Sequence, residues 1–403
     1  MSPSTMNSPN IAIIGGGLGG LVLLLTLSRR GVPATLYERD ANANVRAHFG
    51  GTLDLGWTNG QRALRENGLE DAFKTNSRPE GEEMRIYDAS GKLHFHNEGH
   101  GEDGGPAPPE RTRPEIDRTV LRKLLLDACP PDSIKWDHAL TSATPLGDGK
   151  HSLAFSNGFT TTCDILVGAD GANSRVRPLV SPATPFYSGV NGAEISLTPT
   201  VAASPELADP VAAVGKGSAF VMGENKLFAS QVNGDGRLRT YTLVRAPADW
   251  TLPTDPAEAR ATLLALYDGF VPWARKLVEH ADPAAMYQRA MYVLKPGHKW
   301  THRTGVTLIG DAAHLMTPFA GAGANLAMLD GLELALVLVE EIGRGAEGDV
   351  DAGITRVEEN MCAMAGRVSQ QSWDNLHAFV NEKAPQSALD RFAELMAGPE
   401  REG

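Results

Sequence analysis

Cysteine is scarce in this sequence. Three cysteines, Cys129, Cys163 and Cys362, are spread over 403 residues. Disulfide-built domains and structural zinc sites need closely spaced cysteines, so both are excluded and we expect no metal. So few and such scattered thiols suit a reducing compartment, and we predict a cytoplasmic protein.

Basic residues and long apolar runs are also in short supply. Lys and Arg number 37 against 49 Asp and Glu, which gives a formal net charge of −12. A negative chain repels the phosphates of nucleic acids and of anionic membranes, so neither is expected as the main partner. The run LVLLLTL at 21–27 is too short for a membrane span. Residues 1–9 lack the basic region of a signal peptide, and we expect a loose tail there.

Glycine, in contrast, is abundant, and its first cluster has an informative spacing. Gly15, Gly17 and Gly20 form a G-x-G-x-x-G motif between the apolar run IAII and the helical pattern LVLLLTLSRRG. In a β-α-β unit these glycines permit a tight turn, the approach of a pyrophosphate and close helix–strand packing, in that order. Eighteen residues after Gly20, the strand pattern ATLYERD contains Glu38, an acid placed to bind ribose hydroxyls. We predict adenine-dinucleotide binding through Gly15, Gly17, Leu18, Gly20, Glu38 and Arg39.

A second strand-to-helix segment, VTLIGDAAHLMTPFAGAGAN, lies at 306–325. Asp311 follows an apolar run, and a loop of small residues leads into the helical pattern NLAMLDGLELALVLVEEI. A carboxylate accepts hydrogen bonds from a polyol, while the free N–H groups of a helix start favour negative charge. The segment therefore predicts a site for a hydroxylated chain and a delocalised anion, made by Asp311, Gly323, Ala324 and Asn325.

The pattern of apolar and turn residues divides the chain into two interleaved parts. From about 180 to 295, short alternating segments such as SAFVMG, KLFASQV and LRTYTLV are separated by turn residues, which favours a mainly antiparallel sheet. Before and after this part, strand and helix patterns alternate as in a parallel α/β sheet. We expect a nucleotide-binding domain over 10–75, 106–180 and 291–345, a sheet domain over 76–105 and 181–290, and a C-terminal helix within 346–403.

Three separated motifs together resemble the class A flavin-dependent monooxygenases, the FAD- and NAD(P)H-dependent aromatic hydroxylases. The motifs are the Gly15–Gly20 cluster with Glu38, the stretch DILVGADGANSRVR at 164–177, and the 310–325 segment. The resemblance implies an α/β fold like that of para-hydroxybenzoate hydroxylase, with a Rossmann-type FAD domain, an inserted antiparallel-sheet substrate domain and a C-terminal helix. It also implies that the second motif, with Asp170, serves FAD and the nicotinamide, and that the third holds the ribityl chain and pyrophosphate.

Within that family the chain is similar to the tetracycline-inactivating monooxygenases. The similarity is carried by GGTLDL at 50–55, RPEIDRTVLRKLL at 113–125, IKWD at 134–137 and IGDAAHLMTPFAGAGAN at 309–325. It implies Asp54 beside the isoalloxazine and Arg118 against the FAD phosphates, although the residues alone also allow a turn acid and a surface ion pair. It implies Pro318 and Gly321 along the reactive face of the flavin. A nicotinamide contact is implied for Arg46, whose neighbours are offset by one residue from the family pattern.

The substrate side departs from the tetracycline pattern. Those enzymes bind the drug through a Gln, an Arg and a His of the sheet domain, and the matching positions fall near Gly192, Gly217 and Arg239. A pocket without those hydrogen-bonding groups is not expected to take the same ligand. We predict instead an apolar pocket, while ordinary helix packing remains the other interpretation of its two helix residues, Asn375 and Phe379. The candidate substrate residues are Phe228, Phe319, Asn375 and Phe379.

The resemblance implies a reaction as well as a fold. NADPH or NADH would reduce FAD, O2 would add to give a flavin C4a-hydroperoxide, and a mid-sized aromatic or polycyclic substrate would be hydroxylated. Tetracycline inactivation, epoxidation, Baeyer–Villiger insertion, isoprenoid reduction and a non-catalytic binding protein of this fold stay open as alternatives. A flavin halogenase is not expected, because the chain has no W-x-W-x-I-P pattern. The sequence allows a monomer or a dimer.

Histidines are not expected to act as catalytic bases. His48 and His314 are assigned to packing or backbone hydrogen bonds. His94, His96 and His100 are assigned to solvated loop positions, since a Gly-rich segment gives no reason to expect metal-ligand geometry.

Overall fold

A parallel sheet forms the first part of the molecule. The computed structural model describes residues 9–45, 50–99 and 108–397. Five parallel strands lie in the order β19-β11-β1-β2-β7. Their bounds are β1 (Ile11–Ile14), β2 (Ala34–Tyr37), β7 (Ile134–Lys135), β11 (Ile165–Gly168) and β19 (Val306–Leu308). β1 and β11 are buried along their whole length, which explains their uninterrupted apolar sequences.

The parallel sheet is covered by helices and by a smaller sheet. Helix α1 (Leu18–Arg29) packs along α10 (Gly323–Gly343). The approach is close because both helices present glycine: a Cβ at Gly331 would lie 2.3 Å from the Gly19 carbonyl oxygen. An antiparallel sheet, β8 (Leu140–Gly147), β9 (Lys150–Phe155) and β10 (Thr160–Cys163), contacts β2, and the rings of Tyr37 and Phe155 stack at 4.7 Å.

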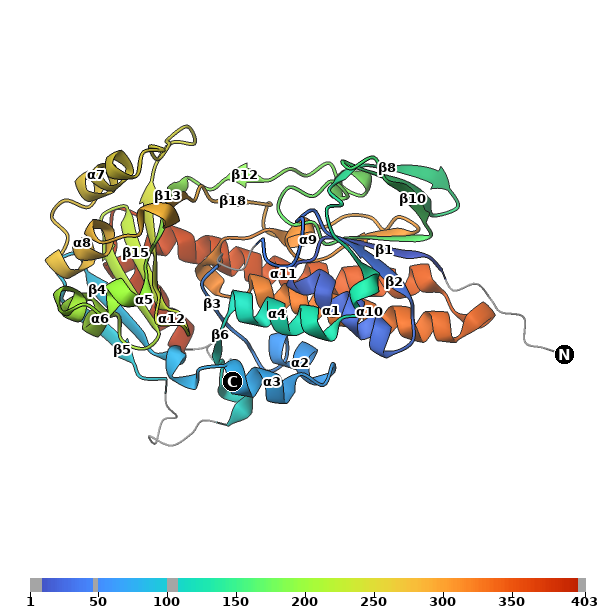
Figure 1. Cartoon of the computed structure of the whole chain (residues 1–403), viewed down its shortest axis with the longest axis horizontal. Coiled ribbons are helices and arrows are strands. Elements are labelled where there is room, and N and C mark those ends of the chain that lie inside the picture. Colours follow the sequence, from blue (N-terminus) through green and yellow to red (C-terminus); the bar gives the residue numbers. More distant parts are fainter. Residues whose placement is uncertain (1–8, 46–49, 100–107, 398–403) are drawn as a thin grey trace.

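A seven-stranded sheet forms the second part, beside the first along the long axis of the molecule (Figure 1). All neighbouring strands are antiparallel except β14 and β4. Strands from 84–97 and from 190–288 thus share one sheet. In spatial order they are β17 (Tyr287–Gln288), β13 (Val190–Leu197), β16 (Leu238–Arg245), β15 (Lys226–Val232), β14 (Ser218–Gly223), β4 (Met84–Asp88) and β5 (Leu93–Asn97).

Alternation along these strands gives the seven-stranded sheet two different faces. The outer face, with Ile195 and Phe228, packs in one apolar core with three helices. These are α6 (Ala208–Val214), α7 (Pro256–Leu266) and α8 (Pro272–Glu279). The inner face, with Leu227 and Leu243, packs against the C-terminal helices. Figure 1 shows the three outer helices on the side away from the parallel sheet.

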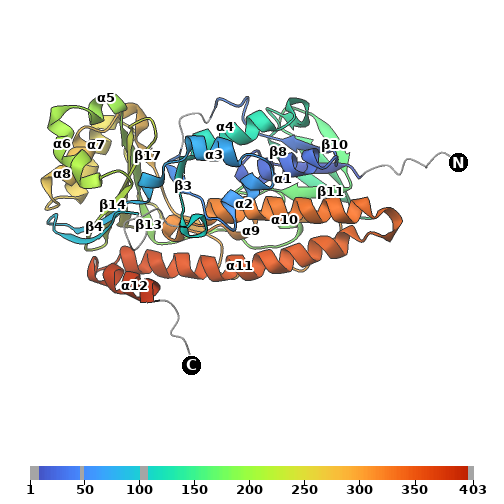
Figure 2. The same cartoon turned by 90° about the horizontal axis from the view of Figure 1, so that it is seen from below.

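Two helices, not one, form the C-terminal part. α11 (Val350–Phe379) runs along the molecule beneath both sheets, and α12 (Gln386–Ala397) comes after it, near the seven-stranded sheet (Figure 2). The sequence predicted a single helix at 350–381. The chain leaves the helical conformation at Val380, and α12 begins directly after Pro385, which has no N–H for a helical hydrogen bond. Phe392 of α12 packs on Phe379 at 5.3 Å.

The remaining elements connect the two sheets. Among the residues that the structure describes, no helix is long and apolar enough to cross a membrane. The connecting elements are β3 (Thr52–Asp54), α2 (Gly60–Arg65), α3 (Glu70–Asn76), β6 (Glu115–Asp117), α4 (Arg118–Ala128), β12 (Phe186–Tyr187), α5 (Pro199–Ala202), β18 (Tyr292–Val293) and α9 (Asp311–His314).

Candidate active site

The glycine-rich turn before α1 has the geometry that its motif predicts. Gly15 has φ +108°, and a Cβ there would lie 2.3 Å from the Ala169 carbonyl oxygen. A Cβ at Gly20 would lie 2.2 Å from the Gly15 carbonyl oxygen, so neither position tolerates a side chain. At Gly17 a Cβ would meet no atom within 4 Å. Gly17 is also the N-cap of α1 and gives no side-chain cap, which leaves the first N–H groups of the helix, from Leu18 on, for a ligand.

Glu38 lies at this turn as well. Its carboxylate is 3% exposed, and it accepts hydrogen bonds from Gly16 N at 2.6 Å and from Asp40 N at 3.0 Å. Glu38 therefore holds the turn while standing where a ribose is expected. Arg39 is exposed and forms no ion pair with another described residue. Arg46 and His48 lie outside the described residues.

Asp311 and the start of α10 belong to the third motif, residues 310–325. Gly310 has φ +61° and precedes Asp311, which is the first residue of α9 and is exposed. Helix α10 begins at Gly323 without a side-chain cap, and a Cβ at Gly323 would meet no atom within 4 Å. An open backbone at the start of a 21-residue helix is suited to negative charge on a ligand.

Asp54, Gly321 and Asn325 come together although they are far apart in sequence. A Cβ at Gly321 would lie 3.4 Å from Asp54 Oδ1. Asn325 Nδ2 donates to the Asp54 carbonyl at 2.8 Å, and Asn325 Oδ1 accepts from Gly56 N at 2.9 Å and Gly60 N at 3.2 Å. The Asn325 side chain is thus engaged within the protein on both its oxygen and its nitrogen. The backbone N–H groups of the helix start remain the groups predicted to face the cofactor.

The carboxyl of Asp54 lies among other charged groups. Burial raises its pKa, and Arg113, whose Nη2 is 3.0 Å from Asp54 Oδ2, opposes the rise. Glu115 is directly opposite Asp54 in the β3–β6 pair. Burial raises the pKa of Glu115 to about 8, with Arg78 lowering it and Asp54 raising it further. Two nearby acids with raised pKa values are typical of functional sites.

Arg118 and Arg122 extend from α4 along the glycine-rich segments. Arg118 N donates to the Gly51 carbonyl at 3.1 Å, and the Arg118 side chain covers Gly50, where a Cβ would lie 2.7 Å from Arg118 Cδ. Arg122 Nε donates to the Gly16 carbonyl at 3.2 Å. Sequence reasoning missed Arg122. Its position four residues after Arg118, on the same helix face, is the signal that could have found it.

Arg177 of the second motif, residues 164–177, hydrogen-bonds the backbone of the third motif, residues 310–325. Asp170 Oδ2 accepts from Arg175 N at 2.6 Å, whereas Asp170 Oδ1 is buried without a hydrogen-bond partner among the described residues. Arg177 Nε donates to the Ala312 carbonyl at 2.7 Å and its Nη2 to the Asp311 carbonyl at 3.3 Å. Arg177 was also missed, because nothing in the sequence shows that its partner is the backbone beside Asp311.

These groups fit an FAD molecule. The turn at Gly17 and the start of α10 offer open backbone, and Asp170 Oδ1 is a buried acceptor without a protein partner in the described chain. A buried polar atom normally has a partner, so this oxygen is suited to a hydroxyl or N–H of a ligand.

Three of the four predicted substrate residues also come together. Phe319 and Phe379 meet edge to face, with ring centroids 5.7 Å apart. Asn375 Nδ2 donates to the Phe319 carbonyl at 2.9 Å, and Asn375 Oδ1 accepts from Arg391 Nε at 3.1 Å. Asn375 therefore positions the 318–321 loop rather than offering its amide to a ligand. Pro318 and Gly321 of that loop are exposed.

The structure places Phe228 elsewhere. Its side chain is fully buried on the outer face of the sheet, with the ring 4.2 Å from that of Tyr267. Successive strand residues point to opposite faces, so Leu227 and Ala229 face inward instead. Phe228 does not meet Phe319 or Phe379, and its prediction as a pocket residue is wrong.

Gly192 and Gly217 lie near the positions where the tetracycline enzymes carry polar substrate-binding side chains, and neither glycine leaves room for a Cβ. A Cβ at Gly192 would lie 1.8 Å from the Thr242 carbonyl oxygen, and Gly192 has φ +155°. A Cβ at Gly217 would lie 2.2 Å from the carbonyl oxygens of Gly81 and Glu83. Neither position can carry the Gln or Arg of the tetracycline enzymes in this backbone.

The described histidines form specific pairs. Buried His314 lies 2.7 Å from Asp330 through Nε2, which is a carboxylate contact rather than the backbone bond expected. Burial acts to lower the pKa of His314, but the charge and hydrogen bond of Asp330 outweigh it, and the pKa is raised. His94 and His96 lie on β5 and pair with Asp88 and Glu83, so the solvated-loop prediction for them was wrong. His100 lies outside the described residues.

Comparison with known proteins agrees with this geometry. Residues 9–352 match the family model described as FAD binding domain. The monooxygenase asqM of Emericella nidulans is 30% identical, over 96% of this chain and 98% of that protein. The structure of Klebsiella pneumoniae HpxO with FAD and uric acid superposes with a TM-score of 0.75 at 24% identity, covering 96% of this chain and 93% of that one. The tetracycline destructase Tet(51) has a TM-score of 0.71 at 20% identity, covering 96% of both chains.

The chain belongs to the FAD-binding family of class A flavin hydroxylases, as its three motifs predicted. The fold prediction is confirmed with it. Within the family, the protein is an FAD-dependent monooxygenase.

Proposed function

We propose that this monooxygenase uses NADPH or NADH and O2 to hydroxylate a mid-sized aromatic or polycyclic molecule. The observation that carries the proposal is the convergence of Asp54, Gly321 and Phe319 where the two sheets meet. One side of the 318–321 loop faces the predicted ring of the flavin, and Phe319 belongs to the aromatic cluster beneath the inner sheet face. A loop in this position can bring an aromatic substrate to the flavin.

Individual residues of the chain are assigned to parts of FAD. When bound, reduced FAD supplies the activation of O2. The uncapped start of α10 stabilises negative charge on the ring, and the apolar Phe319 side chain limits access of water. We assign the pyrophosphate to Gly15, Gly17, Leu18 and Gly20, the adenosine ribose to Glu38 and Arg39, the phosphates to Arg118, the polyol chain to Asp170 and Asp311, and the isoalloxazine to Asp54, Pro318, Gly321, Gly323, Ala324 and the Asn325 backbone.

The same interpretation assigns the domains. We propose that residues 10–75, 106–180 and 291–345 form the FAD domain and that 76–105 with 181–290 form the substrate domain. The β4–β14 pair, which joins 84–88 to 218–223 within one sheet, supports this division.

The test is an assay of purified protein. Bound FAD is measured from the visible spectrum, and NADPH and NADH oxidation are followed with phenols, polycyclic polyketides, indole alkaloids and tetracycline. We expect one compound to stimulate oxidation of the nicotinamide and to gain the mass of one oxygen atom. The structure of that product separates hydroxylation from epoxidation and Baeyer–Villiger insertion. A protein that takes up no FAD and oxidises no nicotinamide would support the non-catalytic alternative.

Tetracycline is kept as the second candidate substrate. The shared fold with Tet(51) favours it, whereas the glycines at 192 and 217 disfavour it. Oxygenation of tetracycline at a rate above that of the other compounds would establish it.

A further inference from the structure

Asp117, the residue before Arg118, is an N-cap aspartate that does not cap its helix. It is the last residue of β6 and the N-cap of α4. An aspartate in this place normally accepts hydrogen bonds from the first N–H groups of its helix, as Asp255 does for α7 and Asp349 for α11. The backbone of Asp117 (φ −63°, ψ 131°) matches that of Asp255 (φ −71°, ψ 125°) and permits the same bond. Asp117 nevertheless makes none with α4, all of which the structure describes.

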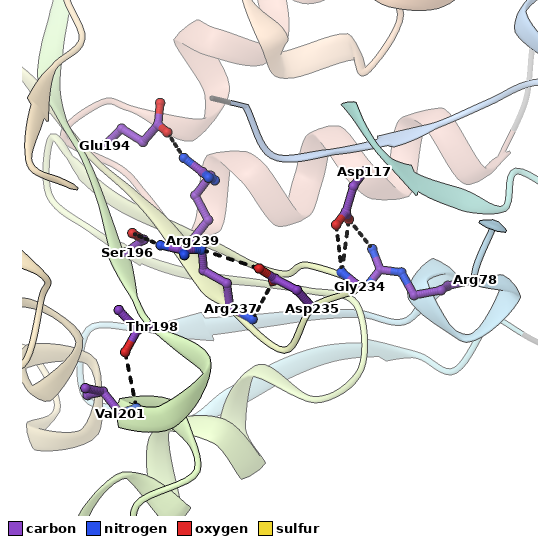
Figure 3. A network of polar contacts seen from close by, with 10 residues as sticks. All are labelled: Arg78, Asp117, Glu194, Ser196, Thr198, Val201, Gly234, Asp235, Arg237 and Arg239. Atoms are coloured by element: carbon purple, nitrogen blue, oxygen red, sulfur yellow. Dashed lines mark hydrogen bonds and ion pairs between the residues drawn. The ribbon is translucent and has the colours of Figure 1, made fainter. Parts of the chain in front are cut away.

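The carboxylate of Asp117 is bound by the seven-stranded sheet instead. Gly234 N donates to Asp117 Oδ1 and Oδ2, both at 3.0 Å. Arg78 Nη2 donates to Asp117 Oδ1 at 3.0 Å, and Arg78 Nη1 donates to the Val232 carbonyl at 2.9 Å. Val232 ends β15, and Gly234 lies in the turn between β15 and β16. We call Arg78, Asp117 and Gly234 the Asp117 clamp, and Figure 3 shows its contacts.

The Asp117 clamp acts directly beside the residue predicted to hold the FAD phosphates. It fixes the backbone from which Arg118 projects, and Arg118 N itself donates to the Gly51 carbonyl at 3.1 Å. It also keeps a negative carboxylate away from the start of α4. A released Asp117 carboxylate would be free to cap α4 as Asp255 caps α7. In that position it would repel a phosphate and compete with it for Arg118.

We propose that Asp117 is a positioning residue for FAD: Arg78 and the turn at Gly234 hold its carboxylate against the seven-stranded sheet and so keep the phosphate site at Arg118 open. The affinity for FAD thereby depends on the contact between the β15–β16 turn and the start of α4. This inference rests on the proposed function, in which Arg118 binds the FAD phosphates. It adds a residue that acts through Arg118 and does not itself touch FAD.

Substitution of Arg78 tests the Asp117 clamp. In Arg78→Gln the Asp117 carboxylate loses its cation and keeps the Gly234 N–H as its partner. We expect FAD to bind ~10-fold more weakly, the effect of one charge-assisted hydrogen bond. The double variant Arg78→Gln with Asp117→Asn has no carboxylate to release, so its affinity should return to within ~3-fold of the wild type. Arg78→Lys keeps the charge but lacks the fork that reaches two acceptors, and its affinity should lie between those of Arg78→Gln and the wild type.

The affinity is measured on the holoprotein and needs no substrate. Stepwise dilution releases FAD, and the fluorescence of the released FAD gives the dissociation constant. The series is run at ~50 and ~500 mM KCl, since the higher concentration screens a through-space effect of the lost charge but not a direct contact. We expect the loss in Arg78→Gln, relative to the wild type at the same salt concentration, to persist at the higher one.

Arg237→Gln is the matched control, because it removes a guanidinium that pairs with Asp235 in the same turn and leaves the Asp117 clamp intact (Figure 3). Its FAD affinity should stay within ~2-fold of the wild type. A double variant that binds FAD no better than Arg78→Gln, as expected if both side chains only stabilise the fold, or a loss that disappears at high salt, would overturn the inference. Arg118→Gln separates it from the proposed function. Unchanged affinity in Arg118→Gln overturns both, whereas a loss there with none in Arg78→Gln overturns the inference alone.

Discussion

The side chain of Asn325 hydrogen-bonds the backbone of Asp54, although the two residues are 271 positions apart in the sequence. Asn325 Nδ2 donates to the Asp54 carbonyl oxygen at 2.8 Å. The same amide holds Gly56 and Gly60 through Oδ1. Asn325 is 1% exposed, so these hydrogen bonds are shielded from solvent in the folded protein. One side chain therefore fixes the start of α10 against β3, beside which the flavin ring is predicted to bind.

Asn325→Ala is expected to lower the free energy of unfolding by about 2–4 kcal/mol, since three buried groups lose their partner. FAD affinity should fall as well, because β3 and the helix start are no longer held together. Urea denaturation and FAD titration measure the two effects. Asn76→Ala, which removes an exposed hydrogen bond within α3, should stay within about 0.5 kcal/mol of the wild type. A variant at 325 with wild-type stability and FAD affinity would contradict the role given to this amide.

Gly17 and Gly20 should respond differently to the same substitution. At Gly17 a Cβ meets no protein atom within 4 Å and φ is −76°, so Gly17→Ala should fold with wild-type stability. It should bind FAD at least ~10-fold more weakly, because the methyl group occupies the space given to the pyrophosphate. At Gly20 a Cβ would lie 2.2 Å from the Gly15 carbonyl oxygen, so Gly20→Ala should destabilise the fold itself. Apoprotein melting and FAD titration separate these outcomes.

Gly343→Ala is the control for both glycine variants. It lies at the end of α10, where a Cβ would meet nothing within 4 Å. Neither stability nor FAD affinity should fall. Wild-type FAD affinity in Gly17→Ala would remove the pyrophosphate from this turn.

The buried pair of His314 and Asp330 should make stability depend on pH. The folded pKa of His314 is raised above its value in the unfolded chain, about 6.5. Such a group contributes its full stabilisation below the unfolded pKa and loses it as the pH rises through the folded pKa. His314→Gln should therefore cost most near pH ~5.5 and less near pH ~9. Denaturation curves across this range measure the cost, and one that stays constant or grows with pH would contradict a raised pKa.

The cofactor half of the site could be predicted from sequence because its constraints are local. Gly15 and Gly20 are required by backbone contacts within a β-α-β unit, and such contacts recur at fixed spacing. Asp54, Arg118 and Asp311 were predicted from short motifs, the first two through the family resemblance, and their contacts with FAD remain predictions. Arg177 was missed, since its partner is a carbonyl 135 positions away.

The substrate half could not be predicted in the same way. Phe228 was assigned to the pocket, but one step along a strand reverses the face, and the adjacent Leu227 and Phe228 put a large apolar side chain on each face of β15. The second C-terminal helix, α12, was missed because the sequence does not show that α11 ends at Phe379 and that a new helix begins after Pro385.

Glu115 also makes stability fall as the pH rises, but here it is the ionised form that is costly, so its substitution is expected to stabilise at high pH. Its carboxyl is 5% exposed, and burial raises its pKa to about 8, while the unfolded value is 4.5. Arg78 Nη2 is 3.7 Å from the carboxyl but is bound more closely by Asp117, at 3.0 Å (Figure 3). The folded state therefore holds a proton that the unfolded state releases, and stability falls as the pH rises from 4.5 through about 8.

Glu115→Gln removes this loss because a glutamine cannot ionise. We expect the variant and the wild type to have similar stability near pH ~5 and the variant to be more stable near pH ~9, by up to several kcal/mol, since one pKa unit corresponds to about 1.4 kcal/mol. Arg78 keeps Asp117 as its partner in the variant, so the ion-pair network does not lose its cation. Glu359→Gln, at an exposed position of α11, controls for the loss of one negative charge. A wild type that stays at least as stable as Glu115→Gln at high pH would show that Glu115 is ionised at little cost in the folded protein, with Arg78 compensating its burial.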